Sequence, residues 1–412
     1  MRILHVNRYL HRRGFADAYA EDLAQLQHVA GHEVTFFGMR HPANRTYQYE
    51  RSFPSHVELD PGRAGPVDKV KGVGRATWSP SASHGMDDVL ADFQPDVVHL
   101  HDVYGELSPS VLRPVAKRGI PAIMTLHDYT LACPTHELMD HGTPCTACIT
   151  GGPMQAVRRR CGSSLARSTA AAIRTSLHRM THAYAPVHRF LCPSWFLADV
   201  MRSANVFPYR LHVQEYFVDT DAIVPGHLPG DDAVYHGPLT PDRGVDVLVR
   251  AWPQVPGGAH LHVVGDGQER ATLEALAEEL APGRVTFHGE LDTAKAHGLI
   301  RGAVCVVSPS VAHDSQASSV LEAFACGRPV VATRLGALPE VVDPGIDGEL
   351  VAPGDPAALA DAIASLLAAP ERAADMGDAA RAKAERRFAP AVHADAIEHH
   401  YEDVRDRVRI GA

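Results

Sequence analysis

The stretch SPSVAHDSQASSVLEAFACGRPVVAT, residues 308–333, carries the pattern that decides the fold. The apolar runs VCVV at 304–307 and PVVA at 329–332 flank a short helical segment that ends near Gly327. This order predicts a strand, a loop of small hydroxylated residues, a helix and a second strand. The unpaired N–H groups at a helix N-terminus and the positive end of the helix dipole favour an anion. The stretch therefore predicts an anion site.

Two carboxylates, Asp314 and Glu322, stand eight positions apart within this stretch. Glu322 lies about two turns into the predicted helix, where its oxygens can accept hydrogen bonds from a ribose; otherwise it is an exposed helix carboxylate. Asp314 either faces the ligand or caps the helix. We interpret the stretch as part of a binding site for a phosphorylated sugar such as a nucleotide.

Ten short apolar runs alternate with helical segments along the chain. They lie at 3–6, 34–37, 96–100, 122–126 and 189–192, and at 233–236, 261–264, 285–288, 304–307 and 329–332. The segments between them have the lengths of the crossover connections in a parallel sheet. We predict an α/β protein with two doubly wound, Rossmann-like domains.

We place an N-terminal domain at 1–210, a C-terminal domain at 211–385, and a last helix that packs back on the N-terminal domain at 386–412. The segment 60–85 is rich in glycine, proline and serine and predicts a loop. Ligands of doubly wound sheets bind at the carboxyl ends of the strands, so the cleft between the domains is the expected site.

The composition predicts a cytoplasmic protein. The 412 residues are 45% hydrophobic and 21% charged, as in globular proteins, and exceed the size of one ordinary core. No apolar run approaches the length of a membrane span, and the N-terminus lacks the apolar core of a secretory signal. The net charge of −10 argues against nucleic acid as a partner.

One basic segment, 141–198, contains no Asp or Glu. Its arginines are Arg158, Arg159, Arg160, Arg167, Arg174, Arg179 and Arg189. Two interpretations stay open: a solvated basic helix, or a surface that contacts an anionic membrane or a phosphate-bearing acceptor. The second would make the protein a peripheral membrane protein.

Several segments resemble the family 4 glycosyltransferases, which are retaining enzymes of the GT-B fold. They are RRGFADAYAEDLAQLQHVAGHEVTFFGM at 12–39, DVVHLHD at 96–102, MTLHDYTLACP at 124–134, HGPLTPDRGVDVLV at 236–249, VVGDG at 263–267 and the stretch at 308–333. Single segments are weak signals, but their order is specific and covers nearly the whole chain. The resemblance implies two facing Rossmann-like domains with an interdomain cleft. It also implies retaining, metal-independent sugar transfer from a nucleoside diphosphate donor such as a UDP or GDP sugar.

The resemblance also implies roles for individual residues. The donor would contact Gly14, Arg243, Gly265, Asp314, Ala317, Ser318, Ser319 and Glu322, and the acceptor would contact Phe15, His101, Asp102 and Asp128. His127, Arg243 and Asp314 would take part in catalysis, with Arg243 stabilising charge that develops on the diphosphate. The acceptor would be either a polysaccharide or lipid-linked glycan, or a small natural product.

The chain departs from the family pattern at four positions of the expected site. Pro238 stands where the family has Arg, Arg243 where it has Lys, Asp314 where it has Glu, and Phe15 where it often has a second Gly. These departures keep two alternatives open: a sugar-nucleotide-binding protein without transfer activity, and a sugar-nucleotide epimerase of the same fold.

The seven cysteines divide into two groups. Cys192, Cys305 and Cys326 lie in apolar segments and read as buried small hydrophobes. The others, Cys133, Cys145, Cys148 and Cys161, have the spacing Cys-x11-Cys-x2-Cys-x12-Cys. This spacing is typical of a structural zinc site, while free thiols and disulfides remain the alternatives.

Overall fold

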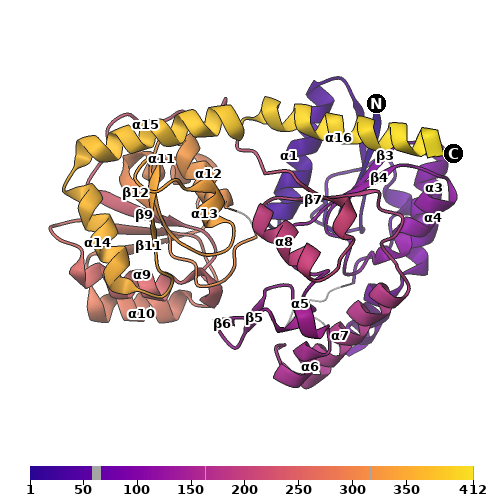
Figure 1. The fold of residues 1–412 in the computed structure, drawn as a ribbon, viewed down its shortest axis with the longest axis horizontal. Helices are drawn as coiled ribbons and strands as arrows, with labels where there is room; N and C mark the ends of the chain where they lie inside the picture. The colour runs from indigo at the N-terminus through magenta and orange to yellow at the C-terminus, as the bar shows by residue number, and fades with distance from the viewer. Residues whose placement is uncertain (58–65, 163, 316, 412) are drawn as a thin grey trace.

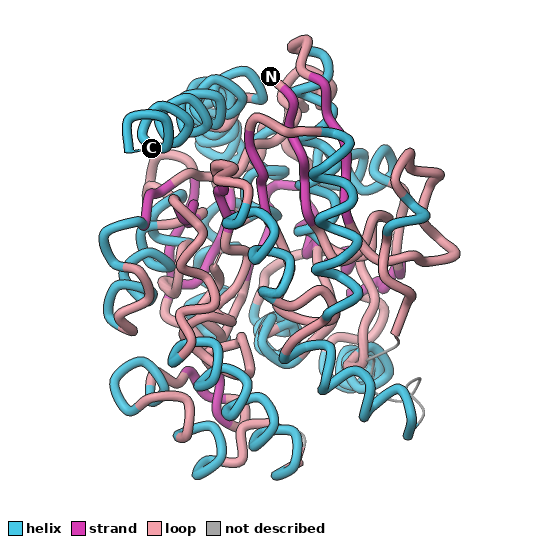
Figure 2. Tube along the Cα trace, turned by 90° about the vertical axis from the view of Figure 1, so that its right-hand side faces the viewer, coloured by secondary structure: helices cyan, strands magenta, loops and turns pink. Residues whose placement is uncertain are grey.

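Two parallel six-stranded sheets, one in each half of the chain, form the centre of the computed structural model, which describes residues 1–57, 66–162, 164–315 and 317–411 (Figure 1). Helices cover the strands of both sheets, and both chain ends lie on the N-terminal domain (Figure 2). The predicted α/β class with two Rossmann-like domains is confirmed.

The N-terminal sheet has the order β2-β1-β3-β4-β7-β8. Its strands are β1 (Arg2–Val6), β2 (Glu33–Phe37), β3 (Val97–Leu100), β4 (Ala122–Thr125), β7 (Arg189–Cys192) and β8 (Leu211–Val213). The helices of this domain are α1 (Phe15–Val29), α2 (Pro66–Thr77), α3 (Pro80–Phe93), α4 (Leu112–Lys117), α5 (Ala147–Gly151), α6 (Gln155–Arg159), α7 (Leu165–Met180) and α8 (Trp195–Ser203), with the short η1 (Glu50–Ser52), η2 (Pro109–Val111) and η3 (Pro208–Arg210). A separate antiparallel hairpin pairs β5 (Met139–Asp140) with β6 (Thr143–Pro144).

The C-terminal sheet has the order β11-β10-β9-β12-β13-β14. Its strands are β9 (Asp232–His236), β10 (Leu261–Val264), β11 (Val285–Gly289), β12 (Ala303–Ser308), β13 (Val330–Thr333) and β14 (Gly348–Val351). The helices are α9 (Val245–Ala251), α10 (Arg270–Leu280), α11 (Thr293–Gly302), α12 (Ser318–Ala325), α13 (Leu338–Val341), α14 (Pro356–Leu367) and α15 (Pro370–Arg387), with η4 (Pro241–Arg243) and η5 (Trp252–Gln254).

All ten apolar runs form strands, and two predictions about the segments between them are wrong. Helix α2 and the start of α3 occupy most of the predicted loop at 60–85, whose first six residues lie outside the described residues. The N-terminal sheet continues through β8, so the predicted domain boundary after residue 210 falls one strand too early.

The last helix, α16 (Pro390–Gly411), runs from the C-terminal domain back across the N-terminal domain, where it packs on α1 and β4 (Figure 1). Ile397, Tyr401 and Val404 are buried at helical spacing and form its apolar face. Two polar contacts anchor the same face: an ion pair between Arg189 and Asp403, and a hydrogen bond of 2.9 Å between Tyr19 Oη and His393 Nε2. Among the described residues, no helix combines the length and the apolar content that crossing a bilayer demands.

The Tyr401 hydroxyl makes further buried contacts between α16 and the N-terminal domain. Tyr401→Phe therefore tests the docking of α16. Its hydroxyl accepts from Gln27 Nε2 at 2.9 Å and lies 2.6 Å from His99 Nδ1. The substitution leaves two buried polar groups unpaired, and we expect a loss of about 2 to 4 kcal/mol in unfolding free energy. Urea denaturation measures this. Tyr209→Phe, at a 97% exposed residue, serves as control and should change stability by less than about 0.5 kcal/mol. Equal stability of Tyr401→Phe and the unsubstituted protein would contradict the role of this hydroxyl.

Candidate functional site

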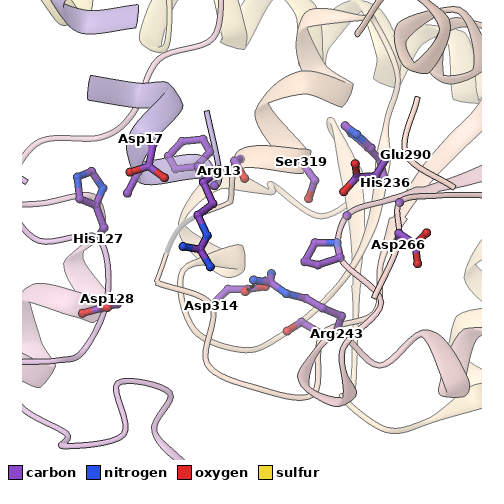
Figure 3. Close-up of a pocket in the computed structure, with 18 of the residues that line it drawn as sticks. Arg13, Asp17, His127, Asp128, His236, Arg243, Asp266, Glu290, Asp314 and Ser319 are labelled. Atoms are coloured by element: carbon purple, nitrogen blue, oxygen red, sulfur yellow. Dashed lines mark hydrogen bonds and ion pairs between the residues drawn. The ribbon is translucent and has the colours of Figure 1, made fainter. Parts of the chain in front are cut away.

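A cavity of about 730 Å³ lies between the two domains, at the carboxyl ends of strands from both sheets. Figure 3 shows Asp17, His127 and Asp128 of the N-terminal domain on one side. Arg243 and Ser319 lie on the C-terminal side. This is the position at which doubly wound domains bind ligands.

The cavity lining includes most of the residues that the sequence singled out. The lining residues among them are Gly14, Phe15, Asp102, His127, Asp128, Pro238, Arg243, Gly265, Asp314, Ser318 and Ser319. Ala317, Glu322 and His101 do not line it.

Arg243 is the last residue of η4, and the backbone after it fixes its position. Gly244 has a φ of 65°, and a Cβ there would lie 2.1 Å from the carbonyl oxygen of Pro309. Only glycine allows this approach, which holds η4 against the loop that follows β12. Arg243 Nη1 is 2.8 Å from Asp314 Oδ1, and its Nε is 3.3 Å from Asp242 Oδ2.

Asp314 is buried, and its backbone is fixed by the loop before α13. The Ala337 N–H donates to the Asp314 carbonyl at 2.9 Å. Gly336, with a φ of 60°, packs so closely that a Cβ would lie 2.5 Å from the Asp314 backbone. Burial raises the pKa of Asp314, and the charge of Arg243 opposes this rise only in part. The pair thus places one cation and one buried acid side by side in the cavity wall.

The N-terminus of α12 supplies the predicted anion site. Its cap residue, Ala317, offers no side-chain acceptor to the first N–H groups of the helix. Ser318 and Ser319 in the first turn line the cavity (Figure 3). Uncapped N–H groups and the helix dipole favour an anionic ligand there.

Glu322 lies one turn behind these serines and contacts His236, a residue that the sequence did not single out. Glu322 Oε2 is 2.9 Å from His236 Nδ1, and His236 lines the cavity. Burial lowers the pKa of His236, but the Glu322 carboxylate outweighs it, so the pKa is raised above 6.5. Its place at the end of a predicted strand, in AVYH, was the available signal.

Three carboxylates lie on the N-terminal wall of the cavity, which also carries Arg8 and Arg13. Asp17, in the first turn of α1, accepts a hydrogen bond of 2.8 Å from Asn7 Nδ2. Asp102 forms an ion pair of 2.8 Å with Arg8, and burial raises the pKa of Asp128. The sequence identified Asp102 and Asp128 but not Asp17.

Gly14 and Phe15 begin α1 beside this wall. Gly14 is the N-cap with an extended backbone, φ −157°, and an added Cβ would meet no atom closer than 4.0 Å. Its conformation therefore does not require glycine. The Phe15 ring packs edge-on against Tyr216, with 4.8 Å between the ring centroids, and narrows the cavity at this end.

A chain of hydrogen bonds runs inward from the cavity through three histidines. Tyr216 Oη is 2.6 Å from His127 Nδ1, and His127 Nε2 is 3.2 Å from His101 Nδ1. His101 Nε2 is 3.0 Å from His5 Nδ1, and His5 Nε2 is 2.7 Å from Gln27 Oε1. Burial lowers the pKa of His5 and of His127 from 6.5 to about 4 and holds the pKa of His101 well below 6.5, so all three rings are neutral at pH 7.

The carbonyl oxygen of Gln27 sets the direction of the whole chain, because it can only accept. His5 must donate through Nε2 and accept through Nδ1, and the same tautomer follows for His101 and His127. Tyr216 then donates to His127. Both nitrogens of the His127 ring are engaged within the protein.

The sequence predicts that His101 contacts the acceptor, but the structure places His101 outside the cavity lining. It is fully buried behind His127 and does not line the cavity. Alternate residues of a strand share one face, so the spacing in VHLH brings His99 and His101 together. His101 reaches the cavity only through His127.

Other candidate metal ligands lie outside the cavity. Among the described residues, His5, His99 and His101 are the one set of three ligands whose atoms lie within 4.8 Å of one another. Every ring nitrogen of this set already has a hydrogen-bond partner. One Asp-x-Asp sequence, Asp219-Thr220-Asp221, lies between β8 and β9; Asp219 Oδ1 accepts from the Asp221 N–H, and neither carboxylate lines the cavity.

Two family models match the chain. The model described as Glycosyltransferase Family 4 matches residues 16–222, and the model described as Glycosyl transferases group 1 matches residues 230–369. The two matches divide the chain as the two sheets do.

Curated relatives match over part or most of the chain. The D-inositol 3-phosphate glycosyltransferase of Xylanimonas cellulosilytica is 35% identical over 46% of this chain, and the chain spans only 50% of that relative's length. The phosphatidyl-myo-inositol mannosyltransferase of Mycobacterium leprae is 27% identical over 86% of this chain and 84% of the relative. Among solved structures, Anabaena HepE in complex with UDP-glucose is similar at a TM-score of 0.68 and 18% identity, over 98% of this chain and 100% of that one. This similarity identifies the GT-B fold.

The buried histidines predict that the fold loses stability as the pH falls from 6.5 towards 4. In this window the unfolded chain binds more protons than the folded one, because the folded pKa values of His5 and His127 are about 4. Stability is fully present above pH 6.5 and falls below it, by up to about 3 kcal/mol for each such histidine at pH 4. The urea midpoint at pH 7.5, 6.5, 5.5 and 5.0 measures this.

His227→Gln, which removes an exposed histidine, should reproduce the pH profile of the unsubstituted protein. A midpoint that stays constant between pH 6.5 and 5.0 would show that these imidazoles are charged in the folded state.

Proposed function

The chain belongs to glycosyltransferase family 4, and we propose that it transfers a sugar from a nucleoside diphosphate to an acceptor in the interdomain cavity, with retention of configuration. One observation carries the proposal: the Arg243 guanidinium and the uncapped N-terminus of α12 lie on the same wall of one cavity. Together they form a site for a diphosphate.

We place the donor on this wall by starting from its diphosphate. The diphosphate lies between Arg243 and Ser319, with the backbone of Gly265 nearby. Glu322 accepts hydrogen bonds from the ribose, which requires it to release or share its contact with His236. A UDP sugar is the donor we favour, since the similar Anabaena structure contains UDP-glucose; a GDP sugar is the alternative.

The transfer needs no nucleophile from the protein. The bond between the anomeric carbon and the phosphate oxygen breaks, and the acceptor oxygen bonds to the same face of the sugar. The acceptor hydroxyl gives its proton to the departing diphosphate. Negative charge grows on the diphosphate during this step, and Arg243 and the α12 N–H groups stabilise it.

The opposite wall positions the acceptor. Asp17, Asp102 and Asp128 offer carboxylate oxygens to the hydroxyl groups of an acceptor. Asp314 faces the transferred sugar. Because both nitrogens of His127 are engaged, we assign its ring to shaping the cavity beside that sugar rather than to proton transfer. A polyhydroxylated acceptor, free or lipid-linked, suits this wall better than an apolar one.

The surface of α7 suits contact with an anionic membrane, where a lipid-linked acceptor would be met. Ile173 and Met180 are 57% and 78% exposed on one face of this helix, together with Leu165 and Leu177. Arg167 and Arg174 flank this face within the segment that lacks acidic residues. Apolar side chains next to arginines are typical of helices that lie on a lipid surface.

Two arginines of the predicted basic face serve the fold instead. Arg189 is buried and paired with Asp403, and Arg179 Nη2 donates to the carbonyl of Leu131 at 2.7 Å. The exposed basic surface is therefore smaller than the sequence predicted.

Replacement of Arg243 tests the transfer. Arg243→Ala removes the side-chain cation at the diphosphate, and we expect turnover to fall by about 100-fold or more. Release of the nucleoside diphosphate is the measurement, with the donor chosen as the UDP, GDP, ADP or dTDP sugar that most raises the melting temperature.

Arg250→Ala, at an exposed position of α9 in the same domain, should keep turnover within twofold. Near-normal turnover in Arg243→Ala would reject this assignment. A donor that binds but is neither hydrolysed nor transferred would indicate a binding protein, and a sugar isomer formed without acceptor would indicate an epimerase.

Liposome flotation tests the α7 surface. We expect the protein to bind vesicles of phosphatidylcholine with phosphatidylglycerol at low salt, and to leave them as salt rises. The double substitution Ile173→Glu and Met180→Glu should abolish binding, whereas Leu228→Glu, at an 84% exposed residue elsewhere, should not. Absence of binding at low salt would remove the membrane from the proposal and leave a free acceptor.

A further inference from the structure

The segment from Cys133 to Cys161 forms a small unit of its own beside the cavity, and the family function does not explain it. It contains the hairpin of β5 and β6 and the short helices α5 and α6. Figure 1 shows this unit at the edge of the N-terminal domain that faces the C-terminal domain. Its four cysteines have the Cys-x11-Cys-x2-Cys-x12-Cys spacing of a metal site.

The fold brings the first and third cysteines together although fourteen residues separate them in the chain. Cys133 and Cys148 are both 5% exposed, and their thiols interact with each other. Cys145 follows β6 and Cys161 follows α6; both are partly exposed. Cys161 Sγ lies 4.0 Å from Asp140 Oδ1.

Hydrogen-bond donors lie beside two of these sulfurs, as they do around metal-bound thiolates. Thr135 Oγ1 is 3.3 Å from Cys133 Sγ. The Ala147 N–H is 3.5 Å from Cys145 Sγ, across the Cys-x2-Cys turn. A neutral thiol gains little from such donors, whereas a thiolate that ligates a metal accepts stronger hydrogen bonds that fix its orientation.

The backbone of the unit is strained in a way that its hydrogen bonds alone do not explain. Nine non-glycine residues of the described chain have a positive φ, and His136, Leu138, His141 and Arg160 are four of them. Each such residue costs about 1 to 3 kcal/mol. A cross-link among the four cysteines would offset this strain, because it fixes both ends of the unit.

We propose that Cys133, Cys145, Cys148 and Cys161 bind one structural zinc ion. Tetrahedral zinc with Zn–S distances of about 2.3 Å holds its sulfurs about 3.8 Å apart. No three of these four sulfurs lie within 4.8 Å of one another in the described structure, so the cysteines must move closer together when the ion binds. Four thiolates select zinc over magnesium or calcium, which prefer oxygen ligands.

The zinc site supports the acceptor side of the cavity. The Cys133 N–H donates to the Tyr129 carbonyl at 2.7 Å, and the Tyr129 N–H donates to His136 at 3.4 Å. Tyr129 follows Asp128, which lines the cavity. Arg179 also stabilises this loop, because its guanidinium donates to the Ala132 carbonyl at 3.2 Å. Zinc binding therefore fixes the loop that carries Asp128.

Metal analysis of the full chain, purified without chelator, tests the proposal. We expect about one zinc per chain by elemental mass spectrometry. Removing it with a strong chelator should lower the melting temperature by about 5 °C or more, and zinc but not magnesium should restore it. Cys145→Ser and Cys161→Ser should each reduce the zinc retained against a competing chelator at least fivefold. Cys192→Ala, a buried cysteine of β7 outside the unit, should retain it.

The zinc content of the unsubstituted protein tests the proposal even if a variant does not fold. Less than a tenth of an equivalent of zinc would overturn the proposal, and so would iron in its place. Alkylation of the denatured, unreduced chain should modify all seven cysteines, whereas a smaller number would reveal disulfides and also overturn it.

Discussion

The hydroxyl of Tyr401 is the contact on which the arrangement of the cavity depends. It brings the last helix of the chain, which leaves the C-terminal domain, into the hydrogen-bonded interior of the N-terminal domain. Gln27 accepts from His5 through Oε1 and donates to the Tyr401 hydroxyl through Nε2, so one amide joins the two elements. The direction of every hydrogen bond from Gln27 to His127 at the cavity follows from this one amide. The Gln27 amide therefore both anchors α16 and sets the tautomer of His127.

The two walls of the cavity differ in the helix N-terminus more than in their side-chain charges, because acidic and basic residues line both. The C-terminal wall combines Arg243 with the uncapped N-terminus of α12, which favours a diphosphate. The N-terminal wall presents the carboxylates of Asp17 and Asp128, which accept hydrogen bonds from hydroxyls, while the Asp102 carboxylate is paired with Arg8. We therefore place the diphosphate against the α12 N-terminus, with its sugar directed across to the N-terminal wall.

The sequence was sufficient for what depends on local pattern and insufficient for what depends on long-range packing. Runs rich in valine and isoleucine revealed the central strands, but β8 and β14 are short edge strands with half-buried side chains. Two glycines made α2 look like a loop, because glycine weakens a helix without excluding it. The contact between His236 and Glu322 joins positions 86 residues apart, and the position of His236 at the end of a strand is a signal that other histidines share. His101 was expected at the cavity because it ends a strand; its burial follows from the ring of His127 in front of it.

The four departures from the family pattern are better explained as an adjusted site than as an eroded one. Arg243 carries a longer, forked cation where the family has lysine, and Asp314 is shorter by one carbon than the usual glutamate. The two changes are complementary, because the longer and the shorter side chain still meet at 2.8 Å. Random loss of the arginine would leave the buried Asp314 carboxyl without its partner, which destabilises the fold. Pro238 removes a cation from the loop, and its carbonyl oxygen now accepts a hydrogen bond of 2.7 Å from the buried Tyr235. This contact holds η4 close to its strand, and Arg243 is the one cation that a diphosphate would meet in this loop.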